Sequence, residues 1–285
     1  MNRQELANLA EATLQILERG TYLDPTGQTV TIHEALQTAV KRSRLYRLED
    51  FPANLTPPDE ARRFAKPVTE VTQETTLAAA HRLVSNHPHD EPLCLNFASA
   101  KNPGGGFQTG ATAQEESLAR ASGLYPCLTK WMEMYKYNRQ LHTCLYSDLM
   151  IYAPSVPVFR EDDGALLAEP YQTAFIAAPA VNAAVIRQKE LMRLPQICPV
   201  MAERLRKILW VAWQQGHKRL VLGAWGCGVF GNDPYEVADL LAEALLEGGE
   251  FHGAFAHVTL AIYDRTNNRA VYAPFQRRFN NLSMK

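Results

Sequence analysis

The sequence predicts an α/β fold in which a mixed or mostly parallel sheet lies between two layers of helices. From residue 68 onwards, short apolar runs with strand character alternate with longer segments of helical periodicity. Such alternation is typical of a three-layer α/β/α domain. The first 67 residues have a different pattern. We therefore expect residues 1–67 to form an accessory segment packed on a catalytic domain of residues 68–285.

The accessory segment begins with a predicted helix. Leucines recur at helical spacing over residues 2–19, and Gly20 is suited to end the helix. Residues 21–32 are predicted to form a short hairpin. The pair Thr31 and Glu34 has capping-box spacing, which predicts a second helix that runs to about Ser43. Residues 44–67 contain four prolines and are expected to be loop.

The larger domain contains six strand candidates and six helix candidates. The strand candidates are short apolar runs at 68–72, 92–98, 149–153, 172–178, 219–224 and 257–263. The helix candidates have longer, periodic patterns at 75–86, 113–122, 124–137, 182–191, 199–215 and 234–247. Open α/β sheets bind ligands at the carboxyl ends of their strands. This order therefore draws attention to the loops after residues 92–98 and 219–224.

Composition limits the classes of partner and cofactor. The 285 residues carry a formal net charge of −1, so no cationic surface is predicted for direct binding of nucleic acid or membrane. The five cysteines form no C-x-x-C pair, and His87-Pro88-His89-Asp90-Glu91 lies in one loop, so no metal site is predicted. We expect a cytoplasmic protein that acts as a monomer and needs no cofactor.

The loop after residues 219–224 contains a glycine pattern. Gly226, Gly228 and Gly231 have G-x-G-x-x-G spacing between a strand and a helix. A dinucleotide-binding Rossmann fold is nevertheless disfavoured, because the next suitable acid, Asp264, follows Gly231 by 33 residues rather than about 20. Backbone N–H groups in such a loop can still hold a diphosphate. A simple tight turn from strand to helix is the alternative.

The loop after residues 92–98 joins glycines to acids. Asn102-Pro103 breaks the strand, and the glycines at 104–106 permit close approach of the backbone to a ligand. Gln114-Glu115-Glu116 then opens a predicted helix, where acids are favoured by the dipole alone. Adjacent helical residues diverge by about 100°. If both glutamates serve one ligand, we expect one to hold a sugar hydroxyl and the other to donate a proton to a leaving oxygen.

These two loops together resemble a known family. LNFASAKNPGGGF followed by QEE resembles the signature of the poly(ADP-ribose) glycohydrolases (PARGs), and LGAWGCGVFGNDP resembles their second glycine loop. The resemblance covers most of the chain and is to the compact bacterial type. It implies a macrodomain fold with an N-terminal helical extension. It also implies hydrolysis of the ribose–ribose O-glycosidic bonds of poly(ADP-ribose), with release of ADP-ribose and without a metal.

The resemblance assigns roles to residues of this sequence. Glu116 would be the general acid/base, Glu115 would bind ribose hydroxyls beside the scissile bond, and Gln114 would fix the loop. The substrate-binding residues that it implies lie in the two loops: Asn102, Gly104, Gly105 and Gly106 in the first, and Gly226, Cys227, Gly228, Val229 and Phe230 in the second. Phe230 would pack against the ribose.

An adenine pocket is expected near the last strand. Macrodomains commonly stack adenine on an aromatic residue there, which makes Tyr272 and Phe275 candidates, and Glu74 is a candidate for the adenine amino group. Core packing or a solvated loop is the alternative for each. The implied partners are poly(ADP-ribose), ADP-ribose and ADP-ribosylated proteins.

Two further functions remain open at this point. A macrodomain can bind ADP-ribose without catalysis, or it can hydrolyse mono-ADP-ribosylated protein or a free nucleotide derivative. The adjacent Glu115 and Glu116 favour an enzyme over a binding module.

Overall fold

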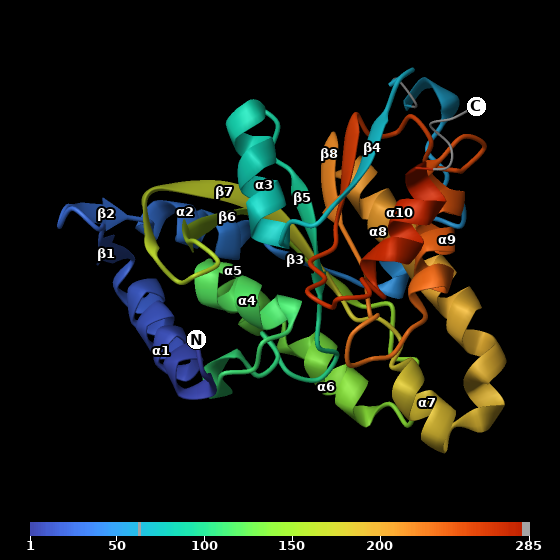
Figure 1. Ribbon diagram of the computed structural model, residues 1–285, viewed down its shortest axis with the longest axis horizontal. Helices are drawn as coiled ribbons and strands as arrows, with labels where there is room; N and C mark the ends of the chain where they lie inside the picture. The colour runs from blue at the N-terminus through green and yellow to red at the C-terminus, as the bar shows by residue number, and fades with distance from the viewer. Residues whose placement is uncertain (62–63, 281–285) are drawn as a thin grey trace.

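A mixed seven-stranded sheet forms the centre of the molecule in the computed structural model, which describes residues 1–61 and 64–280 (Figure 1). Its strand order is β3-β6-β7-β5-β8-β9-β4. The strands are β3 (Arg44–Tyr46), β4 (Val68–Thr72), β5 (Leu93–Phe97), β6 (Met150–Arg160), β7 (Leu166–Ala178), β8 (Arg219–Leu222) and β9 (His257–Ala261). β4, β9, β8, β5 and β7 are parallel, and β6 and β3 continue the sheet in antiparallel pairs.

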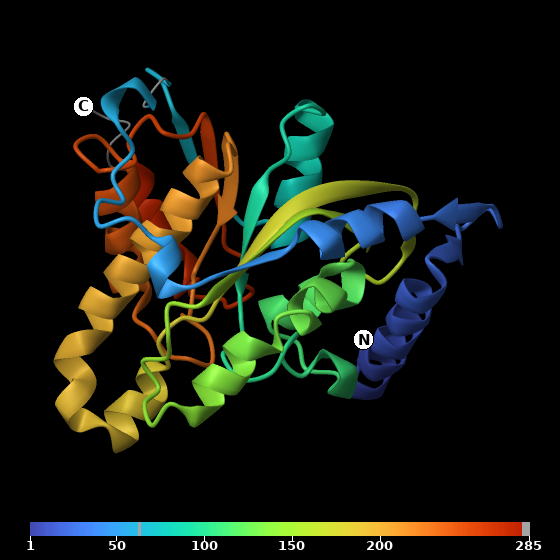
Figure 2. The same ribbon diagram turned by 180° about the vertical axis from the view of Figure 1, so that it is seen from behind.

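Helices cover both faces of this sheet, as the sequence predicts (Figures 1 and 2). Successive strand residues point to opposite faces, so Leu93 and Leu95 of β5 pack in one core cluster and Cys94 packs in the other. The cluster around Leu93 includes α7 (Ala183–Lys189), α8 (Ile197–Gln214), α9 (Pro234–Leu245) and α10 (Tyr272–Asn280). The cluster around Cys94 includes α3 (Thr76–Asn86), α4 (Gln114–Ala121), α5 (Leu124–Thr129) and α6 (Met132–Gln140).

The N-terminal segment packs directly against the first glycine loop. It consists of α1 (Arg3–Arg19), the hairpin β1 (Thr21–Leu23) and β2 (Thr29–Thr31), and α2 (His33–Arg42). Ala10 of α1 forms a small buried cluster with Phe107 of the short helix η3 (Phe107–Thr109) and with Ala119 of α4. The Arg3 Nε donates to the Thr109 carbonyl at 2.9 Å. α1 therefore buttresses the loop that carries the glycines.

Two predictions for the N-terminal segment are wrong. Ile32, not Thr31, is the N-cap of α2, and no side chain caps this helix, because Thr31 pairs with Thr21 in the hairpin. The predicted loop over residues 44–67 begins with β3, whose Leu45 and Tyr46 are buried at the edge of the main sheet. Two short 3₁₀ helices follow, η1 (Leu48–Asp50) and η2 (Asp59–Ala61). The division of the chain at residue 67 stays a prediction. β3 lies before this position and already belongs to the main sheet.

Tertiary contacts also change elements of the larger domain. The single helix predicted over 124–137 is divided into α5 and α6, and between them the Lys130 ammonium donates to the carbonyls of Val40, Lys41 and Ser43 at the end of α2. β6 and β7 extend well beyond their predicted runs as a long antiparallel pair with two register shifts. The helices η4 (Leu191–Gln196) and α10 were not predicted.

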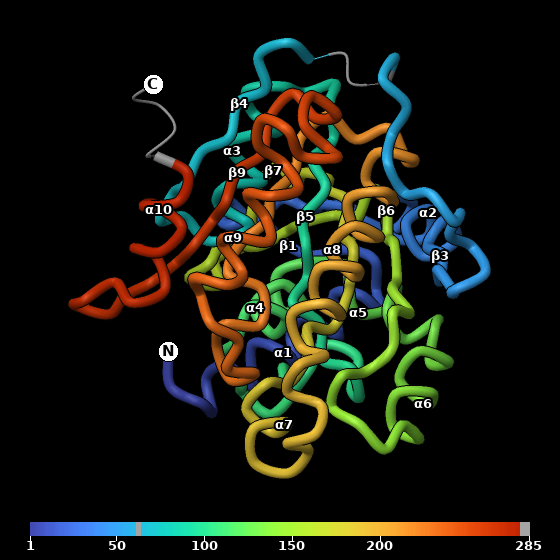
Figure 3. The backbone as a smooth tube through the Cα atoms, turned by 90° about the vertical axis from the view of Figure 1, so that its right-hand side faces the viewer, coloured from blue at the N-terminus to red at the C-terminus, as the bar shows by residue number. Residues whose placement is uncertain are grey.

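The candidate loops meet at one edge of the sheet. β5 and β8 are parallel neighbours, so the loops that follow them lie side by side. β6 is antiparallel to β7, with Ile151 opposite Ala177, so the segment before β6 reaches the same edge. α6 and α7 lie at this end of the molecule (Figure 3). Within the described residues, no helix combines the length and apolarity needed to cross a membrane.

Candidate active site

The first glycine loop folds over the start of α4. Gly104 and Gly105 have φ of 69° and 59°, a conformation that favours glycine, and the Gly105 N–H donates to the Asn102 carbonyl at 3.0 Å. A Cβ on Gly105 would collide with the Glu116 Oε1 and would lie 3.3 Å from the Glu115 Oε2. The absence of a side chain at Gly105 therefore allows the backbone to lie against both carboxyl groups.

Glu115 is held against the end of β5. Its Oε2 accepts from the Ser99 N–H at 2.7 Å and its Oε1 accepts from the Asn96 side-chain amide at 3.2 Å. The side chain is only 2% exposed. Burial, more than the hydrogen bonds that oppose it, raises the pKa of Glu115 to about 8. At neutral pH the carboxyl group is therefore mostly protonated and can donate a hydrogen bond to a ligand.

Glu116 has one free oxygen. Its Oε1 accepts from the Gly106 N–H at 2.9 Å, whereas its Oε2 is buried and has no hydrogen-bond partner among the described residues. A buried carboxyl oxygen without a hydrogen bond is unfavourable unless a ligand or water donates one to it. Glu115 and Glu116 thus reach the same loop but use different partners, and only Glu116 has an oxygen left for a reacting group.

Gln114 joins the start of α4 to β5. Its side-chain oxygen accepts from the Phe97 N–H at 2.8 Å, and its amide donates to the Leu95 carbonyl at 2.8 Å and to the Thr76 hydroxyl at 3.0 Å. These bonds fix the helix that carries both glutamates relative to the strand. The capping interpretation of the Gln-Glu-Glu stretch does not account for these bonds, because they run to Thr76, Leu95 and Phe97 and not to the N–H groups of the helix itself.

The second glycine loop is a closed turn between β8 and α9. Gly226 and Gly231 have φ of 76° and 65°. Asn232 closes the turn, because its backbone N–H and its side-chain amide both donate to the Gly226 carbonyl, at 3.0 and 3.1 Å. Asp233 caps α9 through the Tyr235 N–H at 2.8 Å, as expected for Asn232 or Asp233.

The outer part of this loop is open to a ligand. A Cβ on Gly228 would meet no atom within 4 Å, and Val229 is 86% exposed. Burial raises the pKa of the Cys227 thiol to about 12, so it is not a nucleophile at neutral pH. The loop therefore offers backbone rather than side-chain chemistry, which suits a diphosphate.

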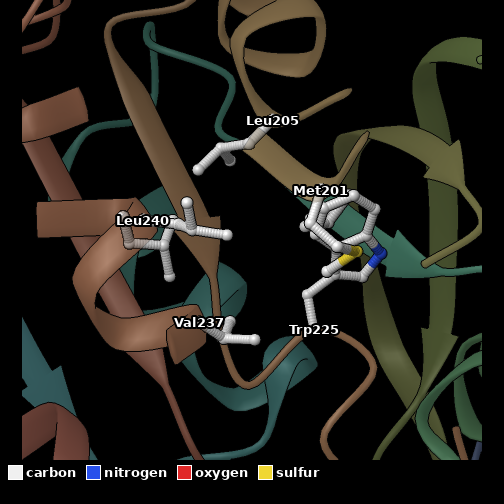
Figure 4. Close-up of a pocket in the computed structure, with 8 residues that line it drawn as sticks. Met201, Leu205, Trp225, Val237 and Leu240 are labelled. Carbon is white, nitrogen blue, oxygen red and sulfur yellow. The ribbon is translucent and has the colours of Figure 1, made fainter. Parts of the chain in front are cut away.

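An apolar base supports the second loop. Trp225 is buried beneath it and donates through its indole nitrogen to the Ala178 carbonyl of β7 at 3.0 Å. Figure 4 shows Trp225 packed beside Met201, with Val237 and Leu240 of α9 on the opposite side. The cavity between these side chains is about 10 Å³, at the lower limit for one water molecule, and is lined by apolar groups. This cavity is a feature of packing and not a ligand site.

The segment before β6 completes the site and was not predicted from the sequence. The Tyr146 ring lies 6.0 Å from the Phe230 ring, and the backbone of Tyr146 has a φ of 59°. Arg204, which is 1% exposed, donates to the carbonyls of Leu145 and Tyr146 at 3.0 and 3.2 Å and forms an ion pair with Asp148 at 2.8 Å. A positive φ at a tyrosine is the signal of local constraint, but only the structure shows it.

The three residues predicted for the adenine pocket lie in three different environments. Phe275 is fully buried in the main core and presents no surface to a ligand, so the prediction that it binds substrate is wrong. Tyr272 is 7% exposed and directs its hydroxyl to the Val71 carbonyl at 3.4 Å. Glu74 forms an ion pair with Arg82 at 2.7 Å, and this contact, the main cause, lowers the pKa of Glu74.

Metal ligands are not gathered at this edge. Within residues 1–61 and 64–280, no three His, Cys, Asp or Glu side chains are grouped so that they could hold a metal ion. Asp90, from the His-Pro-His-Asp-Glu stretch, instead forms ion pairs with Lys218 and Arg219.

Comparison with known proteins identifies the family. The family profile described as microbial-type PARG, catalytic domain, matches residues 10–161, which include the first glycine loop and both glutamates. The crystal structure of PARG from Thermomonospora curvata is 47% identical, with 97% of this chain and 100% of that chain covered and a TM-score of 0.89. The chain belongs to the microbial-type PARG family.

Other PARG structures support the assignment. PARG from Deinococcus radiodurans in complex with ADP-ribose is 46% identical, covers 87% of this chain and 98% of its own, and has a TM-score of 0.79. The T. curvata enzyme has also been solved with the inhibitor ADP-HPD, again at 47% identity with 97% and 100% coverage and a TM-score of 0.89. A search of curated protein sequences gives no significant match. The predicted macrodomain fold is confirmed by this similarity.

Proposed function

We propose that this protein is a poly(ADP-ribose) glycohydrolase that cleaves ribose–ribose O-glycosidic bonds and releases ADP-ribose. The observation that carries the proposal is the buried Oε2 of Glu116, which has no partner in the part of the chain that the structure describes and lies beside a glycine loop and next to a second loop open to a diphosphate. Membership of the PARG family supports it. Poly(ADP-ribose) and ADP-ribosylated proteins are the proposed partners. A cytoplasmic location and a monomeric state remain proposals as well.

The first catalytic step is protonation of the leaving oxygen. The carboxyl group of Glu116, in its protonated form, donates its proton to the oxygen that leaves with the neighbouring ribose, and the C1″–O bond breaks. Positive charge then develops at C1″ in an oxocarbenium-like transition state. When the substrate is bound, its anionic diphosphate favours the protonated form of a nearby carboxyl group.

The second step adds water. A water molecule attacks C1″ and transfers a proton back to the Glu116 carboxylate, which restores the acid and completes the hydrolysis. Glu115, mostly neutral at pH 7, can donate a hydrogen bond to a ribose hydroxyl without placing a second negative charge beside Glu116. Phe230, supported by Tyr146, forms the wall that orients the ribose.

Glu116→Gln tests the proposed acid. The wild type is expected to shorten poly(ADP-ribose) and release ADP-ribose, and the variant to do so about 10²- to 10⁴-fold more slowly. Calorimetric binding of ADP-ribose should be retained in the variant, because the substitution preserves size. Near-normal release by Glu116→Gln would show that another group is the acid.

A second substrate separates the alternatives. Mono-ADP-ribosylated protein is expected to stay intact under conditions in which the polymer is shortened. Binding of ADP-ribose without release from either substrate would instead indicate a binding module.

A further inference from the structure

Arg120 is a buried cation on the helix that carries the proposed acid. It lies in the last turn of α4, one helical turn after Glu116, so the two side chains lie on the same side of the helix. Only 5% of Arg120 is exposed, and no carboxylate lies within ion-pair distance of it in the part of the chain that the structure describes. A buried charge without an ion pair is costly, so other contacts must compensate it.

The Arg120 guanidinium holds the loop between the three glycines and α4. Its Nη1 donates to the Ala111 carbonyl at 2.7 Å and to the Phe107 carbonyl at 3.5 Å. The Ala111 N–H donates in turn to the Gly106 carbonyl at 3.2 Å, and the Gly106 N–H donates to the Glu116 Oε1 at 2.9 Å. Arg120 therefore fixes the same loop whose backbone holds the proposed acid.

The charge of Glu116 also acts on Arg120. Burial lowers the pKa of Arg120, and the Glu116 carboxylate opposes this shift. Gly106 is close to both contact points, because a Cβ built there would lie 3.9 Å from the Glu116 Oε1 and 3.1 Å from the Ala111 Cβ. Opposite charges at such a separation attract each other strongly in a buried site, so the Arg120 cation favours the carboxylate form of Glu116.

We propose that Arg120 is a positioning residue for the hydrolysis, which holds the glycine loop and stabilises the carboxylate that Glu116 becomes when it gives its proton to the leaving oxygen. The proposal rests on the proposed function and deepens it. As the proton passes to the oxygen and the C1″–O bond breaks, one negative charge stays on Glu116. A fixed cation one helical turn away lowers the free energy of that state without touching the substrate, and Arg120 keeps its own protons throughout.

The N-terminal helix holds Arg120 in place. α1 lies beside α4 in both Figure 1 and Figure 2, and the buried Thr13 hydroxyl of α1 donates to the Arg120 carbonyl at 2.6 Å. The same hydroxyl oxygen accepts from the Arg160 Nε at 3.2 Å. Arg160 is also a buried arginine, but its other bond goes to the Gly164 carbonyl in the β6–β7 turn and not to the glycine loop. Arg160 is therefore a matched control for Arg120.

Other titratable groups surround the start of α4. Glu115 is on the same helix, and its pKa of about 8 places its titration within the pH range of the test. Titratable groups on the elements packed against α4 include Arg3 of α1, Lys101 before the three glycines, Tyr125 of α5, Tyr135 of α6 and Arg160 of β6. All of them are retained in the Arg120 variants, so their effects cancel when these variants are compared.

Two substitutions separate the charge of Arg120 from its hydrogen bonds. Arg120→Gln removes the charge but leaves an amide that can donate to the Ala111 carbonyl, whereas Arg120→Lys keeps the charge. With poly(ADP-ribose) as substrate, kcat of Arg120→Gln should fall about 3- to 10-fold and KM should stay within about twofold, because the buried side chain does not reach the substrate. The descending limb of its kcat–pH profile, where the acid loses its proton, should move up by roughly one pH unit. The limb should keep its wild-type position in Arg120→Lys and in the control Arg160→Gln.

A double-variant cycle tests the charge interaction without any substrate. The Tm values of the wild type, Glu116→Gln, Arg120→Gln and the double variant are compared at pH 7. The Tm loss of the double variant should be smaller than the sum of the two single losses by about 2–4 °C, because the interaction can be lost only once. With Arg160→Gln in place of Arg120→Gln, the losses should be additive.

Three results would overturn the role of Arg120: an unshifted limb in Arg120→Gln, an equal shift in Arg120→Lys, or additive Tm losses of Glu116→Gln and Arg120→Gln. Absence of polymer cleavage by the wild type would overturn the proposed function instead. The Tm cycle needs no substrate and therefore separates the two failures.

Discussion

Replacement of Glu115 by glutamine is expected to make the protein progressively more stable than the wild type as the pH rises. Burial raises the pKa of Glu115 from 4.5 to about 8 in the folded protein. The folded state therefore keeps a proton that the unfolded chain loses, so wild-type stability falls as the pH rises between these two values. The glutamine side chain does not titrate, so this loss of stability is absent from the variant.

The size of the effect follows from the two pKa values. Between the two pKa values the folded protein loses about 1.4 kcal/mol of stability for each pH unit, and above both of them the total loss is about 5 kcal/mol. Between pH 5 and pH 7 the wild type should lose about 2–3 kcal/mol relative to Glu115→Gln. Titrating groups that do not interact with Glu115 are common to both proteins and cancel in this difference, whereas the adjacent Glu116 contributes a smaller part of the raised pKa of Glu115. For a chain of this size the change corresponds to about 5 °C in the gap between the two Tm values.

Urea denaturation followed by circular dichroism at pH 5, 6 and 7 measures this gap. The change of the gap with pH is the test, because the amide also alters the bonds to Asn96 and Ser99 by an amount that does not depend on pH. Glu247→Gln, at an exposed position, is the control for the substitution itself. A gap that stays constant from pH 5 to pH 7 would refute the reasoning, because Glu115 would then ionise alike in the folded and unfolded states.

Three further predictions concern other residues. Gly105→Ala should lower kcat for ADP-ribose release about 100-fold while the circular dichroism spectrum is retained, because its Cβ displaces Glu116; near wild-type kcat would show that the loop adapts. Arg204→Met should destabilise the protein by about 3–5 kcal/mol in urea, because three buried carbonyls lose their donor and Asp148 keeps only its ion pair with Lys207; a loss below about 1 kcal/mol would contradict this role. Burial lowers the pKa of His217, so wild-type stability should fall relative to His217→Gln as the pH drops below about 6.5, and parallel pH profiles would contradict it.

Local sequence was sufficient for the glycine loops and for the strands that precede them. Residues 92–98 and 219–224 are short apolar runs, and each is followed by glycines, which are favoured where the backbone has a positive φ. The order strand, loop, helix can therefore be predicted from neighbours in the sequence. The helix that begins at Gln114 was predicted for the same reason. Local sequence does not decide between a capped helix and a reactive loop, because both interpretations need the same residue types.

Elements that depend on distant partners were predicted poorly. β3 is too short to be predicted from its own residues and exists because it pairs with β6. The break between α5 and α6 is associated with Lys130, which binds the end of α2 about 90 residues earlier in the chain. α10 was missed, and Phe275 within it belongs to the core.

The sequence by itself determined which residues could do chemistry: two adjacent glutamates after three glycines, and a second glycine loop that could hold a diphosphate. Only the tertiary structure decided how they share the work. Burial by β5 and its loop raises the pKa of Glu115, and among the described residues only one oxygen of Glu116 has a partner, the N–H of the glycine loop. Burial and hydrogen-bond partners are set by strands far apart in the sequence, which local patterns do not record.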